Sequence, residues 1–92
     1  MPSRLGLAKA AGKIKAGTDF TVEAIRNKEA KLVFLASDAS ANTKKRVLDK
    51  ASFYEVQVLE LFDTETLSRA VGRTNIKALA LTDQGFANMF KK

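Results

Sequence analysis

A chain of 92 residues is long enough for one small folded domain, and the absence of cysteine and histidine removes the usual ligands of zinc and the commonest general base. Sixteen lysines and arginines against ten acidic residues give a net charge of +6, which suits a polyanionic partner. The longest apolar run, residues 32–36, is too short to span a membrane, so we expect a cytoplasmic protein without a metal or a cofactor.

The N-terminal part predicts two helices. Apolar residues recur at helical spacing over residues 5–14 and indicate a first helix that Gly17 ends, with residues 14–16 also compatible with an extended conformation. Thr18 can cap a second, short helix that ends before Glu29. Gly17 therefore stands between two predicted helices.

The middle of the chain predicts two strands separated by a helix. The continuous apolar run at residues 32–36 is typical of a strand covered on both faces. After a polar loop, residues 43–51 indicate a helix whose outer side is largely basic, with Val47 and Leu48 facing inward. Residues 54–62 alternate as a partly exposed strand does.

The C-terminal part adds two helices and a strand. Asp63 or Thr64 opens a helix that Gly72 closes, residues 76–81 form a third strand, and Asp83 caps a final helix. Helices that alternate with strands predict, through the right-handed crossover rule, an α/β fold. We expect a single-domain three-layer α/β/α sandwich over residues 1–92, with a small mixed, largely parallel sheet.

Positive charge is concentrated in three segments, residues 1–17, 44–50 and 69–77, whereas residues 51–68 hold four acidic residues and no basic one. If the basic segments converge, one face of the domain suits a polyanion such as nucleic acid, although the same charge also fits a well-solvated surface. We expect the following cations to share that face: Lys9, Lys13, Lys15, Lys45 and Arg73.

Motifs for catalysis are not found. The five glycines are scattered and form neither a dinucleotide fingerprint nor a phosphate-binding loop. Glu60, Asp63 and Glu65 lie close along the chain, but without histidine they read as strand-end and helix-cap residues. The sequence therefore predicts a protein that is not an enzyme.

Two motifs at a matching separation carry a resemblance to a known family. Residues 13–27 combine a basic segment, a Gly-Thr pair and a short helix of the form Thr-Val-x-x-Ile-Arg-Asn, and the strand and loop at 30–40 follow. Residues 67–72 are similar to a Leu-Gly-x-Ala-x-Gly helix, with serine in place of the first glycine. Over residues 5–82 the chain resembles the ribosomal protein L-seven-Ae family.

Within that family the loop at 38–43 and the tail at 81–88 are most similar to the bacterial YlxQ branch. The resemblance implies an α/β/α sandwich that binds kink-turn RNA, a sharply bent duplex with tandem sheared G·A pairs. It also implies a non-enzymatic, ribosome-associated protein that binds structured RNA by shape and phosphate contacts. We expect a monomer.

The resemblance places RNA at the glycine turn with the helix after it, at the loop after the central strand, and at the loop after the fourth helix. Asp19, Phe20 and Glu23 stand where typical members carry Asn, Glu and Lys, which favours phosphate contacts over base recognition. The implied RNA-binding residues are Lys13, Lys15, Gly17, Thr18, Asp19, Phe20, Glu23, Asp38, Asn42, Lys45, Arg73, Thr74, Asn75 and Ile76.

Alternatives remain open from the residues alone. Gly17 can be only a turn residue, and Phe20 suits a hydrophobic staple or core position as well as a base-stacking one. The carboxylates of Asp19 and Glu23 repel phosphates, which favours a protein-interaction module that has lost RNA recognition. A third hypothesis is the RNA-recognition part of an RNA-modifying enzyme that acts with a catalytic partner.

Overall fold

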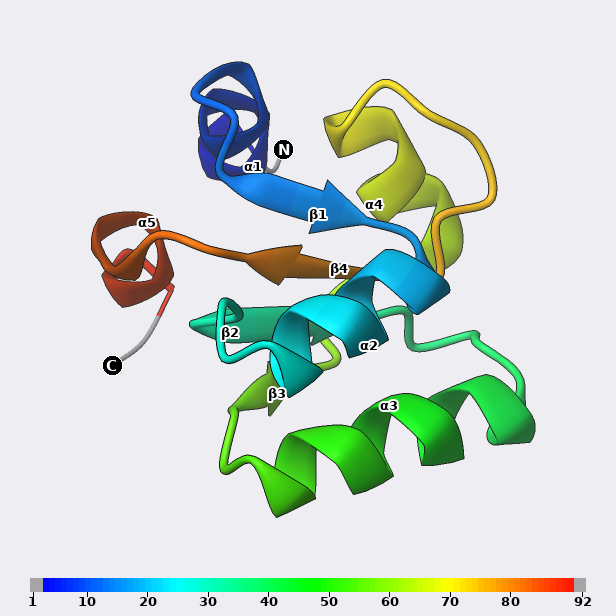
Figure 1. The fold of residues 1–92 in the computed structure, drawn as a ribbon. Helices are drawn as coiled ribbons and strands as arrows, with labels where there is room; N and C mark the ends of the chain where they lie inside the picture. Colours follow the sequence, from blue (N-terminus) through cyan, green and yellow to red (C-terminus); the bar gives the residue numbers. More distant parts are fainter. Residues whose placement is uncertain (1–2, 91–92) are drawn as a thin grey trace.

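The computed structural model describes residues 3–90, in which helices and strands alternate (Figure 1). In chain order the elements are α1 (Ser3–Ala10), β1 (Ile14–Ala16), α2 (Thr18–Arg26), β2 (Leu32–Leu35), α3 (Ala41–Phe53), β3 (Val58–Leu59), α4 (Thr64–Ala70), β4 (Ala78–Leu81) and α5 (Gln84–Asn88). None of the helices in these residues is long and apolar enough to cross a lipid bilayer.

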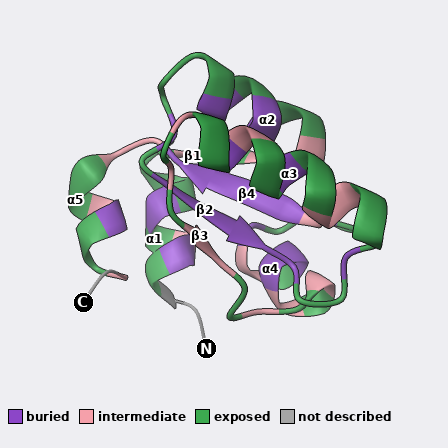
Figure 2. Cartoon of the chain, turned by 90° about the horizontal axis from the view of Figure 1, so that it is seen from below, coloured by how far each residue is buried: buried purple, intermediate pink, exposed green. Residues whose placement is uncertain are grey.

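The strands form one sheet in the order β1-β4-β2-β3. The inner strands β2 and β4 are buried along their whole length, as the apolar run at 32–36 predicted. Helices α2 and α3 cover one face of the sheet, and α1, α4 and α5 cover the other (Figures 1 and 2). The three-layer α/β/α sandwich with a mixed sheet is therefore confirmed.

The expectation that the sheet is largely parallel is wrong. In the described strands only β2 and β3 pair in parallel, whereas β4 runs antiparallel to both β1 and β2. The reason lies in where β4 begins. The amide of Ala36, just after β2, donates to the carbonyl of Lys77, just before β4, at 2.7 Å, so β4 starts where β2 ends and must run back along it.

Turn residues end the first two helices at positions that differ from those predicted from the spacing of apolar residues. α1 ends at Ala10 because Gly12, with φ of 73°, reverses the chain before β1, so Gly17 does not end this helix. α2 ends near its predicted position, although Lys28 rather than Asn27 takes the left-handed conformation. These turns leave β1 as a separate three-residue strand that leads directly into Gly17.

The middle helix is longer and the third strand shorter than predicted. Ser40, not Thr43, caps α3, because its hydroxyl accepts from the Thr43 amide at 3.2 Å. The helix runs to Phe53, which reduces the predicted strand at 54–62 to two residues. Leu48 is exposed rather than inward. The caps at Asp63 and Asp83 are confirmed.

The core lies on both faces of the inner strands. Phe34 of β2 packs its ring against Phe62, with ring centroids 5.7 Å apart, and against Phe90, at 4.9 Å and nearly perpendicular. Edge-to-face aromatic contacts of this kind add to the free energy gained from burial. Figure 2 shows the buried strands between exposed outer helix faces. The rigid sheet is the platform that positions the loops at its ends.

Candidate functional site

Three loops that are distant in sequence meet at one end of the sheet. The amide of Gly17 donates to the carbonyl of Ala78 at 2.8 Å, and the amide of Ala36 donates to the carbonyl of Lys77 at 2.7 Å. The start of α2, the segment after β2 and the segment before β4 are therefore neighbours (Figure 1). We call this region, residues 17–20, 36–43 and 72–77, the Gly17 end.

Gly17 itself has a backbone conformation that other residues rarely adopt. Its φ of 108° and ψ of 150° lie in a region populated almost only by glycine. It stands at the N-cap of α2 without a side-chain capping bond, and its carbonyl accepts the first helical bond, from Thr21 at 2.8 Å. The amides at the start of α2 precede that bond and lack helical carbonyl partners, which leaves them suited to an anion.

Three side chains on the first two turns of α2 are exposed, those of Asp19, Phe20 and Glu23. Phe20 is 55% exposed and is not part of the buried core, so its core interpretation is wrong. Asp19 is exposed and pairs with Arg46 of α3, whose Nη1 lies 2.7 Å from Oδ1. Glu23 is exposed one turn further along, and Thr18 is half-buried. The carboxylate of Asp19 at the Gly17 end is thus neutralised by a cation from the neighbouring helix.

Asp38 belongs to a hydrogen-bond network rather than standing free. Its Oδ1 accepts from the amide and the hydroxyl of Thr64 at 2.9 and 2.7 Å, and Lys77 Nζ donates to the same hydroxyl at 3.2 Å. The Thr64 hydroxyl above all, and then its amide, hold the pKa of Asp38 below its ordinary value. Asp38 therefore ties the loop after β2 to the first turn of α4.

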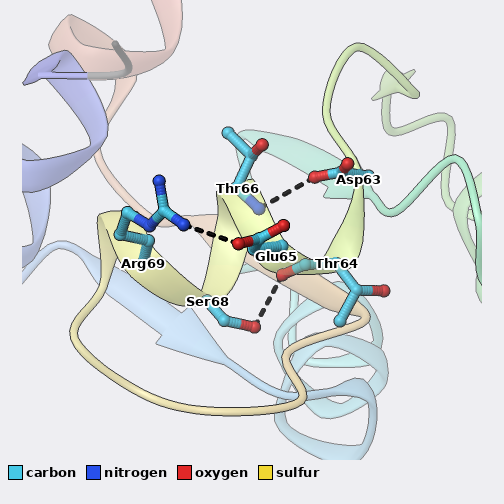
Figure 3. A network of polar contacts seen from close by, with 6 residues as sticks. All are labelled: Asp63, Thr64, Glu65, Thr66, Ser68 and Arg69. Carbon is cyan, nitrogen blue, oxygen red and sulfur yellow. Dashed lines mark hydrogen bonds and ion pairs between the residues drawn. The ribbon is translucent and has the colours of Figure 1, made fainter.

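The loop before β4 is exposed but anchored from below. Arg73, Thr74 and Asn75 are exposed, and Asn75 adopts a left-handed φ of 57°. Ile76 is only 4% exposed, so its side chain belongs to the core and is not offered to a partner. Figure 3 shows the bond of Ser68 to Thr64 in α4, the helix beneath this loop. A shallow, open surface depression lies between α4, Asp38 and the loop.

The expected positive face is only partly assembled. Lys9 lies on α1 and Lys45 on α3, on opposite faces of the sheet, so these two cations do not share a face (Figure 2). Lys13 precedes β1 at the end of the sheet opposite Gly17, where its carbonyl accepts from the Thr82 amide at 2.9 Å. Lys15 is exposed in the middle of β1.

Two of the predicted site residues lie at the start of α3, and one contributor was missed there. Asn42 is exposed in its first turn, and Lys45 is exposed and pairs with Asp49 on the same helix at 3.4 Å. Arg46 was not predicted as a site residue, because only the fold brings it to Asp19. Its position in a basic helix was the one signal in the sequence. Within residues 3–90 no cluster of acidic residues could hold a metal ion.

Comparison with known proteins now identifies the family. A sequence model described as the ribosomal protein L7Ae/L30e/S12e/Gadd45 family matches residues 1–91. The chain belongs to this family. Its similarity to the YlxQ branch is also confirmed, because the RNA-binding protein YlxQ of Enterococcus faecium is 46% identical over 88 residues, which are 96% of this chain and 84% of that protein. YlxQ of Bacillus subtilis is 45% identical, over 91% of this chain and 84% of its own.

Two solved structures share the fold of this chain. A protein of unknown function from Bacillus halodurans superposes with a TM-score of 0.89 at 36% identity, covering 95% of this chain and 88% of that one. The 15.5kD RNA binding protein of Giardia lamblia gives a TM-score of 0.77 at 18% identity, covering 94% and 74%. The second comparison shows the shared fold alone.

Proposed function

We propose that this protein is a non-catalytic RNA-binding protein that recognises sharply bent, kink-turn-like RNA through the Gly17 end, in ribosomal or other structured RNA. The observation that carries this proposal is the convergence of three loops through the Gly17–Ala78 and Ala36–Lys77 hydrogen bonds. The names of the YlxQ relatives support RNA as the ligand. One end of the sheet that presents several loops at once suits a ligand with a defined shape.

The chemistry of this end suits phosphates more than base edges. The open amides at the start of α2 can approach a phosphate, because Gly17 has no side chain and leaves the backbone accessible. Arg73 in the loop before β4 adds positive charge, and Arg46 on α3 offsets the negative charge of Asp19. Phosphate contacts fix the position of a bound RNA, and the bend of the ligand then decides which RNAs can reach all three loops.

The test is a titration of the protein against a kink-turn RNA and a straight duplex of equal length at two salt concentrations. We expect the kink-turn to bind at least about tenfold more tightly, with an affinity that falls steeply as salt rises. Equal affinities for the two RNAs contradict kink-turn recognition. Weak binding to both that does not respond to salt contradicts RNA binding and favours a protein-interaction module.

A pair of charge-matched variants locates the binding surface. Arg73→Ala removes a cation from the Gly17 end, whereas Lys31→Ala removes an exposed cation next to the opposite end of β2. We expect Arg73→Ala to weaken RNA binding several-fold and to lower the salt slope by about one, with a much smaller effect of Lys31→Ala. Equal losses indicate that only the overall charge attracts RNA.

A further inference from the structure

Two loops of the Gly17 end are joined to each other through the first turn of α4. Thr64 donates its amide and its hydroxyl to Asp38 in the loop after β2, and the same hydroxyl accepts from Lys77 next to β4. Asp38 and Thr64 are 26 positions apart in sequence. One hydroxyl therefore serves both partners and ties both loops to the same point of α4.

Ser68 extends this connection into the loop before β4. Its hydroxyl donates to the Thr64 carbonyl at 2.6 Å and accepts from the Ile76 amide at 2.8 Å, and its residue is only 7% exposed (Figure 3 shows the first bond). The Ile76 amide bond is buried, so without the Ser68 hydroxyl this donor is left without a partner. Ser68 thus links the end of the exposed loop directly to α4.

We propose that Thr64 and Ser68 are positioning residues that hold the loops at 37–40 and 73–77 in one fixed arrangement, and that selectivity for bent RNA depends on these two hydroxyl groups. This inference rests on the proposed function. The Ser68 hydroxyl is largely buried, and the Thr64 hydroxyl is already bonded to Asp38 and Lys77, so we infer that both act through the loops that they hold rather than by touching RNA. Loops ordered before binding lose less conformational entropy on binding, which raises affinity for the one ligand shape that fits.

The first test uses Ser68→Ala, with Ser52→Ala on the exposed side of α3 as the matched control. We expect Ser68→Ala to weaken kink-turn binding about tenfold while straight-duplex affinity stays within about twofold. Amide hydrogen exchange of residues 73–76 becomes faster in the same variant, because the loop loses its anchor. Ser52→Ala leaves both affinities and the exchange rates unchanged.

The second test uses the pair Thr64→Val and Thr64→Ser, which differ in keeping the hydroxyl. Thr64→Val removes the bonds of the hydroxyl to Asp38 and Lys77, whereas Thr64→Ser keeps a donor and acceptor at the same place. We expect the valine variant to lose selectivity for the kink-turn and the serine variant to retain it. The melting temperature shows whether Thr64→Val still folds. If it does not, Thr64→Ser decides the test, because loss of kink-turn selectivity in this variant contradicts the inference.

The outcomes separate this inference from the proposed function. If the wild-type protein shows no preference for the kink-turn, the proposed function fails and the inference fails with it. If the wild type prefers the kink-turn and Ser68→Ala and Thr64→Val keep that preference, only the inference is overturned. A loss of affinity for both RNAs in equal measure, together with a lower melting temperature, indicates a purely structural role and also overturns it.

Discussion

The guanidinium of Arg46 on α3 lies 2.7 Å from the carboxylate of Asp19 at the start of α2. Both side chains are largely exposed, at 52% and 84%, so the pair adds little to the stability of the fold. Its importance is local. The acidic residue next to Gly17 has its own counter-ion, which removes much of the repulsion between Asp19 and a phosphate that the sequence alone suggests.

The ion pair leads to a prediction for Arg46→Ala. Removal of the cation leaves the Asp19 carboxylate uncompensated at the Gly17 end, so we expect RNA affinity to fall several-fold and the salt slope to drop by about one. The double variant Arg46→Ala with Asp19→Asn should recover part of the lost RNA affinity, because it also removes the uncompensated carboxylate of Asp19. Filter-binding titrations at several salt concentrations measure both. An effect no larger than that of Lys31→Ala contradicts a special role for Arg46.

Glu23→Lys should tighten binding to a kink-turn RNA. Glu23 is exposed on the second turn of α2, where a lysine replaces a charge that repels phosphates and can donate to guanine O6 or N7. A good contact of that kind discriminates between bases by about 1–3 kcal/mol. The melting temperature should change little, because the helix dipole acts mainly within the first turn.

A straight duplex of equal length serves as the control for Glu23→Lys. A purely electrostatic gain strengthens binding to both RNAs alike, whereas a base contact favours the kink-turn. If neither affinity changes, α2 does not face the RNA.

Gly17→Ala should destabilise the fold through the backbone rather than through a clash. A Cβ at Gly17 would lie 3.7 Å from Phe20 Cδ2, an ordinary contact, but φ of 108° with ψ of 150° is unfavourable for alanine by about 1–3 kcal/mol. Gly12→Ala is the matched control, since its φ of 73° is left-handed and a Cβ there meets no atom within 4 Å. Urea unfolding measures both free energies. A smaller loss for Gly17→Ala than for Gly12→Ala contradicts this account.

The sequence predicts the elements of this fold better than their directions. The buried strand at 32–36 and the caps at Asp63 and Asp83 depend on local patterns, and the structure confirms them. Periodicity carries no information on strand direction, so the antiparallel course of β4 was not predicted. The direction follows from a long-range contact, the bond between the Ala36 amide and the Lys77 carbonyl.

The candidate site was predictable to the same extent. Gly17 was found because a glycine directly before a helix is a local signal, and the structure gives it a conformation suited to glycine. The partners of Asp19 and Asp38, Arg46 and Thr64, lie 27 and 26 positions away, and only the fold brings them together. Sequence spacing alone could not show that both carboxylates are already engaged.

Asp38 should give the fold a dependence on acid pH. Hydrogen bonds from the Thr64 hydroxyl and amide lower the pKa of the folded Asp38 carboxyl, so the unfolded chain takes up its proton first as the pH falls. The stabilisation is complete above the unfolded pKa, near pH 4, and is lost as the pH falls through the lower folded pKa. Asp38→Asn should therefore show a flatter decline of melting temperature below about pH 4 than the wild type.

Asp63 provides the comparison for that pH series. Hydrogen bonds from Thr66 lower the pKa of Asp63 as well, so Asp63→Asn should flatten the same acid limb. The double variant should be flattest. Parallel curves for the wild type and Asp38→Asn contradict a stabilising role of the ionised Asp38.

Phe20→Ser should weaken RNA binding without weakening the fold. The ring is 55% exposed beside Gly17, so its removal sacrifices little buried surface, and serine and phenylalanine have similar helix propensities. We expect a change in unfolding free energy within about 0.5 kcal/mol. An aromatic ring at the Gly17 end offers a face on which an unstacked base can stack. Removal of such a ring costs about 1–3 kcal/mol of binding free energy for each stacked base.

Phe53→Ser is the control for this last prediction, because Phe53 is 79% exposed at the last residue of α3, the end of that helix furthest from Ser40. Phe20→Tyr keeps a stacking face and should retain wild-type affinity. Titration of the variants against one kink-turn RNA shows whether the Phe20 ring stacks on a base or does not contact the RNA. Loss of affinity in Phe20→Ser alone supports base stacking, whereas wild-type affinity in that variant shows that the exposed ring does not contact the RNA.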